Sequence, residues 1–352
     1  VDTGKASPVA GTLNLDLNGN NAISVDATDA AGNVSAPGSQ VLLIDTTPPA
    51  GATLTSSVLT NVATPVLTGT GDPGSEVRVV IGGATYRVQL GTSSTWSVNT
   101  GSAQPASGQL KLNTNGSNIV SLVAADAAGN ESAPFIKSLV IDTTRPLTPV
   151  IKSAALSNDA TPLLSGTAEP GATVSATIAG ARFEIVAAGN GNWSVDLGSA
   201  APASGALSLN ANGGNTLAVV SIDAAGNESA AASQTLVIDT AAPSPPVFTT
   251  AAVSNAPRPV VGGTSEPAAT IEVQIAGANF VVQAAASGLW SVNTQSATSV
   301  SGTLALNENG SNSISARAID LAGNTSAAAT QTLVIDTTAP LDPTITLSLI
   351  HI

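Results

Sequence analysis

Acidic side chains recur along this 352-residue chain at a fixed spacing, and they are the residues best suited to do chemistry. An Asp-x-x-Gly-Asn motif begins at Asp29, Asp126, Asp223 and Asp320, in steps of 97 residues. An Ile-Asp-Thr motif places its aspartate, with the same step, at Asp45, Asp142, Asp239 and Asp336. The same step separates Asp72, Glu169 and Glu266. Nearly half of the 23 acidic residues therefore occupy recurring positions.

Grouped carboxylates of this kind could bind calcium. Ca²⁺ takes roughly six to eight oxygen ligands, and three carboxylates with turn carbonyls and water can supply them. The repeat forms three such sets: Asp45 with Asp72 and Asp126, Asp142 with Glu169 and Asp223, and Asp239 with Glu266 and Asp320. The sequence predicts calcium at each set, because three like charges gathered together would otherwise repel one another. The alternative is that each aspartate caps its own loop in an Asx-turn, with the Gly-Asn pair at positive φ. The sequence leaves both open.

Catalysis by the common constellations is hard to place in this chain. There is no Cys, and the single His, His351, lies in the last six residues, so His-based triads and thiolate or imidazole metal sites are not expected. No P-loop or dinucleotide fingerprint is present. Two carboxylates could serve a glycosidase, but the same carboxylates recur in every repeat. The chain is predicted not to be an enzyme.

Three tryptophans, Trp96, Trp193 and Trp290, recur with the same step. Exposed aromatic rings could stack on sugars, but each ring lies in a Trp-Ser-Val alternation that puts Trp and Val on one face of a strand. Aromatic residues are only 2% of the chain, so each core needs this one large filler. We expect all three to be buried. The Asn-x-Ser matches at Asn33, Asn130, Asn227 and Asn324 are given little weight as glycosylation sites.

The composition narrows the class of protein. The chain is 43% hydrophobic, which is enough to form a packed core. Its net charge is −13, with only ten basic residues scattered along it, and this argues against nucleic acid as a partner. No apolar run approaches the ~20 residues that a membrane-spanning helix needs.

The 97-residue period defines the predicted domains. They are residues 1–45, the C-terminal half of a repeat; three complete repeats, 46–142, 143–239 and 240–336; and 337–352, the start of a further one. Prolines such as Pro48, Pro146 and Pro243 mark the linkers. Residues 347–352 break the pattern and resemble the translation of a transposon sequencing adaptor, so we expect a non-native tail.

Each repeat reads as a small all-β domain. In repeat 143–239 we expect strands near 150–155, 161–166, 173–179, 182–187, 193–197, 215–222 and 232–239, with 206–210 as an edge piece. Inward positions of the strand at 215–222 and its equivalents hold Ile23, Val120, Leu217 and Ile314, then Val25, Leu122, Val219 and Ala316. The prediction is tandem seven-stranded antiparallel Ig-like sandwiches arranged end to end. This topology places Glu169 and Asp223 beside Asp142.

These segments resemble bacterial Ig-like (Big) domain repeats of large Gram-negative biofilm-associated and non-fimbrial adhesins. The resemblance is borne by Thr161–Val174, Asn192–Val195, Asp223–Asn227 and Ile335–Pro340. It implies an Ig-like sandwich, export to the cell surface or medium, a role in adhesion or biofilm formation and, in some members, calcium between domains. This chain has fewer acidic residues per repeat than calcium-rich adhesins have.

The leading functional hypothesis is a stalk or spacer whose immediate partners are the neighbouring repeats of the same chain. Cell-surface or biofilm-matrix components would then be contacted through distal domains. The competing hypothesis makes the repeats themselves binding modules for glycans or host proteins. Identical loop lengths in all repeats favour the spacer, because binding modules usually differ in their loops.

Overall fold

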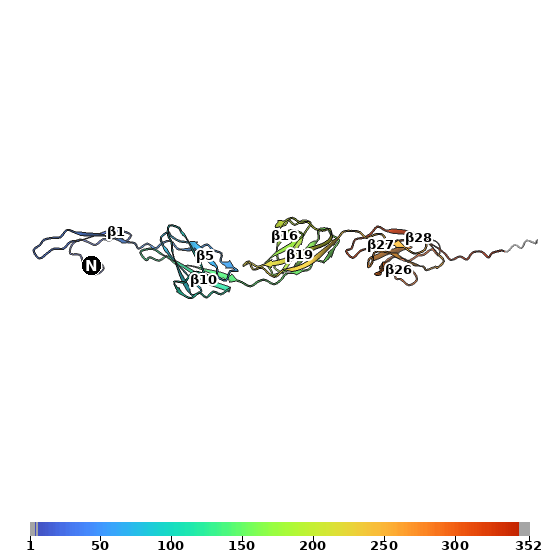
Figure 1. Cartoon of the computed structure of the whole chain (residues 1–352), viewed down its shortest axis with the longest axis horizontal. Helices are drawn as coiled ribbons and strands as arrows, with labels where there is room; N and C mark the ends of the chain where they lie inside the picture. Colours follow the sequence, from blue (N-terminus) through green and yellow to red (C-terminus); the bar gives the residue numbers. More distant parts are fainter. Residues whose placement is uncertain (1–3, 5, 345–352) are drawn as a thin grey trace, which may run out of the picture. The chain divides into compact units, whose positions relative to one another are not determined.

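The computed structural model describes residue 4 and residues 6–344, and all of its regular elements are β-strands (Figure 1). The predicted tail at 347–352, with His351, lies outside the described residues. No helix in the described part of the chain is long and apolar enough to cross a membrane. The chain divides into two compact units: residues up to Pro146 with Ile222–Glu228, and Leu147–Ser221 with the residues from Ser229 onward.

Repeat 143–239 folds as two packed sheets. The first is three-stranded, with β14 between β12 and β17. The second is six-stranded, in the order β13-β20-β19-β15-β16-β18. The bounds are β12 (Val150–Ile151), β13 (Leu156–Ser157), β14 (Leu163–Thr167), β15 (Thr173–Ile178), β16 (Ala181–Val186), β17 (Asn192–Asp196), β18 (Ser204–Gly205), β19 (Asn212–Ile222) and β20 (Ala232–Asp239). The all-β Ig-like fold is therefore confirmed.

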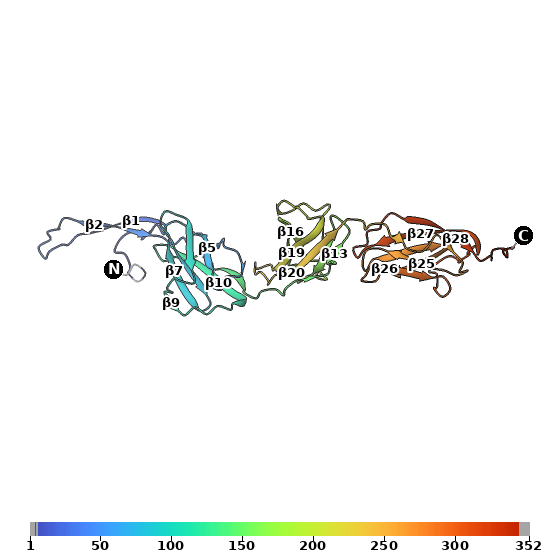
Figure 2. The same cartoon turned by 45° about the vertical axis from the view of Figure 1, so that its right-hand side comes forward.

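Repeat 46–142 has the same three-stranded and six-stranded sheets, whereas the second sheet of repeat 240–336 is five-stranded, with a single bridge from Asn279 to Ser301 in place of the edge strand (Figure 2). Repeat 46–142 contains β3 (Thr53–Leu54), β4 (Leu59–Thr60), β5 (Val66–Thr70), β6 (Glu76–Ile81), β7 (Ala84–Gln89), β8 (Thr95–Asn99), β9 (Ser107–Gly108), β10 (Asn115–Ala125) and β11 (Phe135–Asp142). Repeat 240–336 contains β21 (Val247–Phe248), β22 (Val253–Ser254), β23 (Val260–Thr264), β24 (Thr270–Ile275), β25 (Ala278–Gln283), β26 (Leu289–Asn293), β27 (Asn309–Ile319) and β28 (Ala329–Asp336).

The first strand of each repeat is split between the two sheets, which the sequence did not predict. Of the run expected at 150–155, only Val150–Ile151 forms a strand, β12, which pairs antiparallel with β14; β13 begins just beyond that run, at Leu156, and pairs parallel with β20. The switch occurs where the amides of Lys152 and Ser153 both donate to Ser165 O, at 2.8 and 3.1 Å. The expected edge piece also shifts: the edge strand is Ser204–Gly205, and 206–210 forms no strand.

Each complete repeat has its own hydrophobic core. Three clusters of buried residues are present, and each draws all of its members from one repeat. Trp96, Trp193 and Trp290 are buried, at 2%, 3% and 5% exposure, which confirms their core assignment. A glycine recurs opposite each ring, and a Cβ at Gly166 would overlap both Val150 O and the Trp193 ring. The glycine of the recurring Gly-Thr pair therefore leaves room for the tryptophan ring.

The predicted inward positions behave differently in the half repeat. Val120, Leu122, Leu217, Val219, Ile314 and Ala316 are buried as expected. Ile23 and Val25 are instead 43% and 65% exposed, so their inward assignment is wrong for this structure. They lie on β1 (Gly19–Val25), which pairs only with β2 (Gly38–Ile44) in a two-stranded sheet. The described residues provide no second sheet to cover them.

Candidate functional site: the loops at the repeat junctions

The Asp-x-x-Gly-Asn segments form one structure, here called the junction loop and comprising residues 29–33, 126–130, 223–227 and 320–324. In the second copy, Asp126 Oδ1 accepts hydrogen bonds from the amides of Ala128 and Asn130, both at 2.9 Å, and Asp126 Oδ2 accepts one from Asn130 Nδ2 at 2.8 Å. The Gly129 amide closes the turn onto Asp126 O at 3.2 Å. Gly129 has φ +92°, whereas Asn130 does not enter the positive region, so only the glycine of the expected Gly-Asn pair does so.

Hydrogen bonding within these loops lowers the pKa of the aspartate in all four copies. For Asp29 and Asp126 the side chain of Asn33 or Asn130 is the main cause, assisted by backbone amides. For Asp223 and Asp320 burial raises the pKa, but the hydrogen bonds from the neighbouring asparagine and the loop amides outweigh it. The ionised aspartate is therefore the form that the loop stabilises.

The asparagine of the junction loop has a second partner that the sequence did not predict. Besides its bond to the loop aspartate, Asn130 Nδ2 donates to the main-chain oxygen of Asp45 at 3.0 Å. The same bond joins Asn227 to Asp142 O at 2.8 Å and Asn324 to Asp239 O at 2.7 Å. Each pair lies within one compact unit. The two recurring motifs of the chain are thus hydrogen-bonded to one another.

The aspartate of the Ile-Asp-Thr segment also bonds to the linker residue two positions further along the chain. Asp45 Oδ1 accepts the amide of Thr47 at 2.9 Å, and the equivalent bonds from Thr144 to Asp142 and from Ala241 to Asp239 are 2.9 and 3.0 Å. These are the Asx-turns that the sequence offered as the alternative to calcium. A recurring asparagine outside the motifs, Asn115 in repeat 46–142, also holds the residue after the aspartate. Its Oδ1 accepts the Thr143 amide and hydroxyl at 2.8 and 2.9 Å.

The third acidic position differs between repeats. Asp72 Oδ2 accepts the amide of Ala50, a linker residue, at 2.6 Å. Asp45, Asp72 and Asp126 all line one open hollow of about 690 Å³. Glu169 and Glu266 are exposed on the surface. The structure therefore gathers the first predicted set around one hollow. In the second set, Asp142 and Asp223 lie in one compact unit and Glu169 lies in the other.

The fit of these residues to a calcium ion is partial. The first set offers carboxylate oxygens, the kind of ligand that Ca²⁺ takes. In the described part of the chain, however, no three Asp, Glu, His or Cys side chains converge closely enough to hold a metal. Both oxygens of Asp126 already accept hydrogen bonds from its own loop. As arranged here, the loops are closed by hydrogen bonds among their own atoms.

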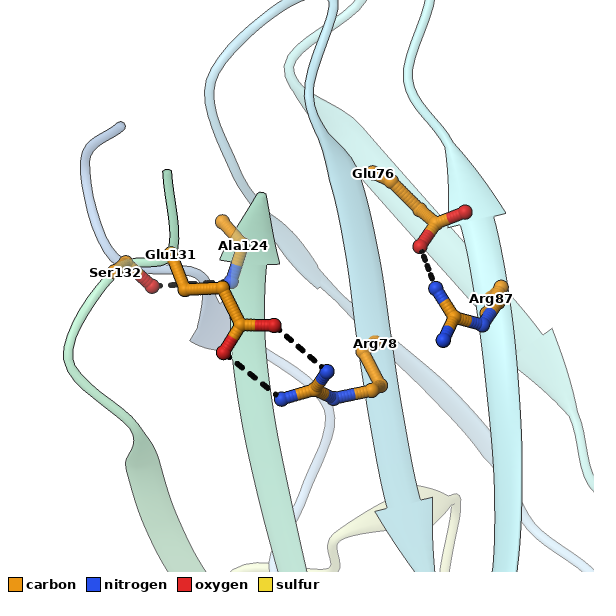
Figure 3. A network of polar contacts seen from close by, with 6 residues as sticks. All are labelled: Glu76, Arg78, Arg87, Ala124, Glu131 and Ser132. Atoms are coloured by element: carbon orange, nitrogen blue, oxygen red, sulfur yellow. Dashed lines mark hydrogen bonds and ion pairs between the residues drawn. The ribbon is translucent and has the colours of Figure 1, made fainter. Parts of the chain in front are cut away.

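The Asn-x-Ser matches are part of the same structure. Ser132 Oγ accepts the amide of Ala124 at 3.0 Å and donates to Ala133 O at 3.2 Å, bridging the end of β10 to the chain that enters β11 (Figure 3). Ser229 and Ser326 repeat the bond from the strand amide, at 3.0 and 2.9 Å. Asn227 is 8% exposed. The pattern that looks like a glycosylation acceptor is therefore explained by hydrogen bonding in the fold.

Comparison with known proteins identifies the family of one repeat. Residues 148–240 match the model of the family described as the bacterial Ig-like domain. This repeat is a bacterial Ig-like domain, as its sequence motifs indicated. A search of curated proteins found no match.

Several solved structures resemble the chain. A tetra-tandem repeat from the extending region of a large adhesion protein is 20% identical, with a TM-score of 0.31; the match covers 92% of this chain and 83% of that one. A Ca²⁺-stabilised adhesin that helps an Antarctic bacterium to reach out and bind ice is 24% identical, with a TM-score of 0.33, over 90% and 81% of the two chains. Fibronectin(III)-like modules of Clostridium thermocellum CbhA are 14% identical, with a TM-score of 0.35, over 53% and 94%.

Proposed function

We propose that this chain is a spacer region of a secreted or surface-anchored bacterial adhesin, which supports adhesion or biofilm formation by holding a distal binding domain away from the cell. The observation that favours this role is where the recurring residues are used. The tryptophan and its facing glycine fill the core, and the recurring Asp, Asn and Ser residues hydrogen-bond at the junctions. The residues that the repeat preserves thus serve shape, which is what a spacer requires, and the proposal assigns the chain no enzymatic activity.

A second candidate, that the repeats bind ligands themselves, is favoured by one specific feature. Repeat 240–336 has a polar hollow of about 460 Å³ on its five-stranded sheet, lined among others by Glu272, Asn279, Ser301 and Arg317. Arg317 and Glu272 form an ion pair there. The equivalent positions in repeat 143–239 hold Val220 and Ser175, so this ion pair has no counterpart there.

A glycan array with the full chain separates the two candidates. A spacer gives no specific hits. If the full chain binds a glycan and Arg317→Ala abolishes that binding, the result contradicts the spacer proposal and supports the proposal that the repeats bind ligands. Lys137→Ala is the matched control, because Lys137 is also an exposed cation on a strand and lies outside the hollow.

Calcium binding stays a prediction within this proposal, at Asp45, Asp72 and Asp126 and at the two equivalent sets. The hollow shared by the first set favours it, and the bonds that already occupy Asp126 oppose it. Extracellular calcium modules bind with dissociation constants of ~0.1–1 mM. At about 1 mM calcium, a ~0.1 mM site stabilises the folded chain by roughly 1.4 kcal/mol.

Titration calorimetry with CaCl₂ tests this prediction on the full chain. The prediction is supported if calcium binds at millimolar concentration and the number of binding sites falls by about one in Asp72→Asn. That substitution removes a carboxylate and keeps an acceptor for the Ala50 amide. Asp196→Asn is the control, since Asp196 belongs to none of the three sets. Heat that is absent, or equal in all variants, would leave the junction aspartates only their role in capping loops.

A further inference from the structure

The junction loops contain an interaction that neither the family nor the calcium prediction requires. The asparagine carboxamide has two N–H groups, and in three copies both are used. One bond stays in the loop, from Asn324 Nδ2 to Asp320 Oδ2 at 2.8 Å, and the other crosses to the preceding repeat, to Asp239 O at 2.7 Å. Because the first bond orients the carboxamide, its second N–H group already points toward the position of the main-chain acceptor.

The acceptor is equally well fixed. Asp239 is the last residue of β20, and its own side chain accepts the Ala241 amide at 3.0 Å. Asn212 Oδ1 accepts the amide and the hydroxyl of Thr240 at 2.9 and 3.1 Å. The peptide that presents the Asp239 oxygen is therefore held by Asn212 of its own repeat and by the linker that follows it, so donor and acceptor are both pre-organised before they meet.

A second contact lies beside the first. In the unit that contains Asn61 and Gly226, Asn61 Nδ2 donates to Gly226 O at 2.8 Å. In the other unit the equivalent Asn158 lies against Gly323, with its Nδ2 3.4 Å from where a Cβ would stand. One hydrogen bond alone would allow one repeat to rotate relative to the next, whereas two separated contacts restrain that rotation about the linker.

We propose that the Asp-x-x-Gly-Asn loop is a docking element that holds each repeat to the preceding one through the asparagine carboxamide, and that this contact needs no metal ion. Its partner is thus a main-chain carbonyl at the end of the neighbouring repeat. The biological use of the contact rests on the proposed spacer function, but the contact itself does not.

The first copy of the loop provides an internal reference. Asn33 makes the same bonds to Asp29, with its amide at 2.9 Å and its Nδ2 at 2.8 Å, but among the described residues its carboxamide reaches no second repeat. Asn33→Ala therefore reports the local cost of losing the loop bond. Asn324→Ala loses that bond and the docking bond together.

Spin-label distance measurements on the full chain test the proposal at the contact between Asn324 and Asp239, which lies within one compact unit. The chain has no cysteine, so Ala201→Cys and Thr298→Cys give two unique, exposed labels at equivalent positions of consecutive repeats. The samples contain excess chelator. We expect a narrow distance distribution that at least doubles in width in Asn324→Ala and broadens in Asn158→Ala. Asp320→Asn keeps an oxygen that can accept from the Asn324 carboxamide and removes the charge that a cation would need, so its distribution is expected to stay narrow.

Three outcomes would overturn the proposal. One is a distribution that is already broad in chelator and narrows only with calcium. Another is an Asn324→Ala profile that superimposes on the parent profile. The third is equal broadening in Asn324→Ala and Asp320→Asn. If Asn324→Ala destabilises its repeat more than Asn33→Ala destabilises residues 1–45, the Asn158→Ala arm decides, because Asn158 lies outside the loop. The glycan array is unaffected by this contact, so failure here leaves the spacer proposal standing.

Discussion

The junction loops and the outer face of the large sheet follow opposite rules. In the loops, the same side-chain bond from asparagine to aspartate forms in every copy. On the sheet face, each repeat has its own ion pairs. Repeat 46–142 pairs Arg78 with Glu131 and Arg87 with Glu76, as Figure 3 shows, whereas repeat 143–239 pairs Arg182 with Glu184.

The difference follows from how geometry enters each interaction. A loop amide that loses its only acceptor in a partly buried turn costs about 1–3 kcal/mol, so the residue is fixed in type and place. An exposed ion pair contributes roughly 0–1 kcal/mol and can form from several positions on one face. Recurrence of one unchanged residue type at 97 residues therefore marks the positions at which the geometry demands that residue.

The largest effect is expected in the core, at a recurring glycine. In Gly166→Ala the added methyl group would overlap Val150 O and the Trp193 ring, so repeat 143–239 should lose about 1–3 kcal/mol of unfolding free energy or more. Hydrogen exchange in increasing urea, resolved by peptide, measures this for each repeat of the full chain. Gly189→Ala is the matched control, because a Cβ at Gly189 meets no atom within 4 Å. Equal costs for the two variants would show that recurrence does not mark a geometric need.

The second effect concerns acid. The folded pKa of Asp320 is lowered, so its contribution to stability is present above the unfolded pKa of about 3.9 and is lost as the pH falls through that value toward the folded pKa. The difference in melting temperature between the parent chain and Asp320→Asn should therefore shrink between about pH 5 and pH 3. Scanning calorimetry at several pH values measures it. A difference that stays constant or widens on acidification would contradict the assigned hydrogen bonds.

The smallest effect is expected on the sheet face. Arg78 and Glu131 are 32% and 51% exposed at their side chains. A double-mutant cycle with Arg78→Ala and Glu131→Ala should give a coupling of about 0.2–1 kcal/mol that weakens in high salt. Arg145→Ala, at an exposed arginine of the linker, serves as the background. A coupling above about 2 kcal/mol would exceed what an exposed pair supplies. It would show that this face, like the loops, is a structural determinant of the repeat.

The sequence predicted most of the fold because its strongest signals are local or periodic. The Trp-Ser-Val alternation indicated buried rings, and Trp193 is 3% exposed. The Asp-x-x-Gly-Asn spacing indicated Asx-turns, which close three of the loops; in the fourth, Asp320 Oδ1 accepts the amides of Gly323 and Asn324. Such patterns depend on neighbours a few residues apart, which the sequence displays directly.

What the sequence could not predict depends on docking between distant segments. The carboxamide of Asn227 could have hydrogen-bonded to its own loop alone, and its bond to Asp142 O follows only from where the preceding strand ends. The 97-residue recurrence of this asparagine is the available signal, but an asparagine after a glycine is equally typical of a turn residue. The split of the first strand, where Lys152 and Ser153 share one acceptor, likewise depends on two sheets competing for a short segment.

Single-molecule extension of the full chain tests the central claim, that this is a string of separately folded repeats suited to spacing. Each complete repeat should unfold in its own event, giving three steps of equal length. A stretched chain spans at most ~3.3–3.6 Å per residue, so each 97-residue repeat should release roughly 30 nm after its folded length is subtracted. Fewer, larger steps, or steps of unequal length, would show that the cores are mechanically coupled and would contradict the account.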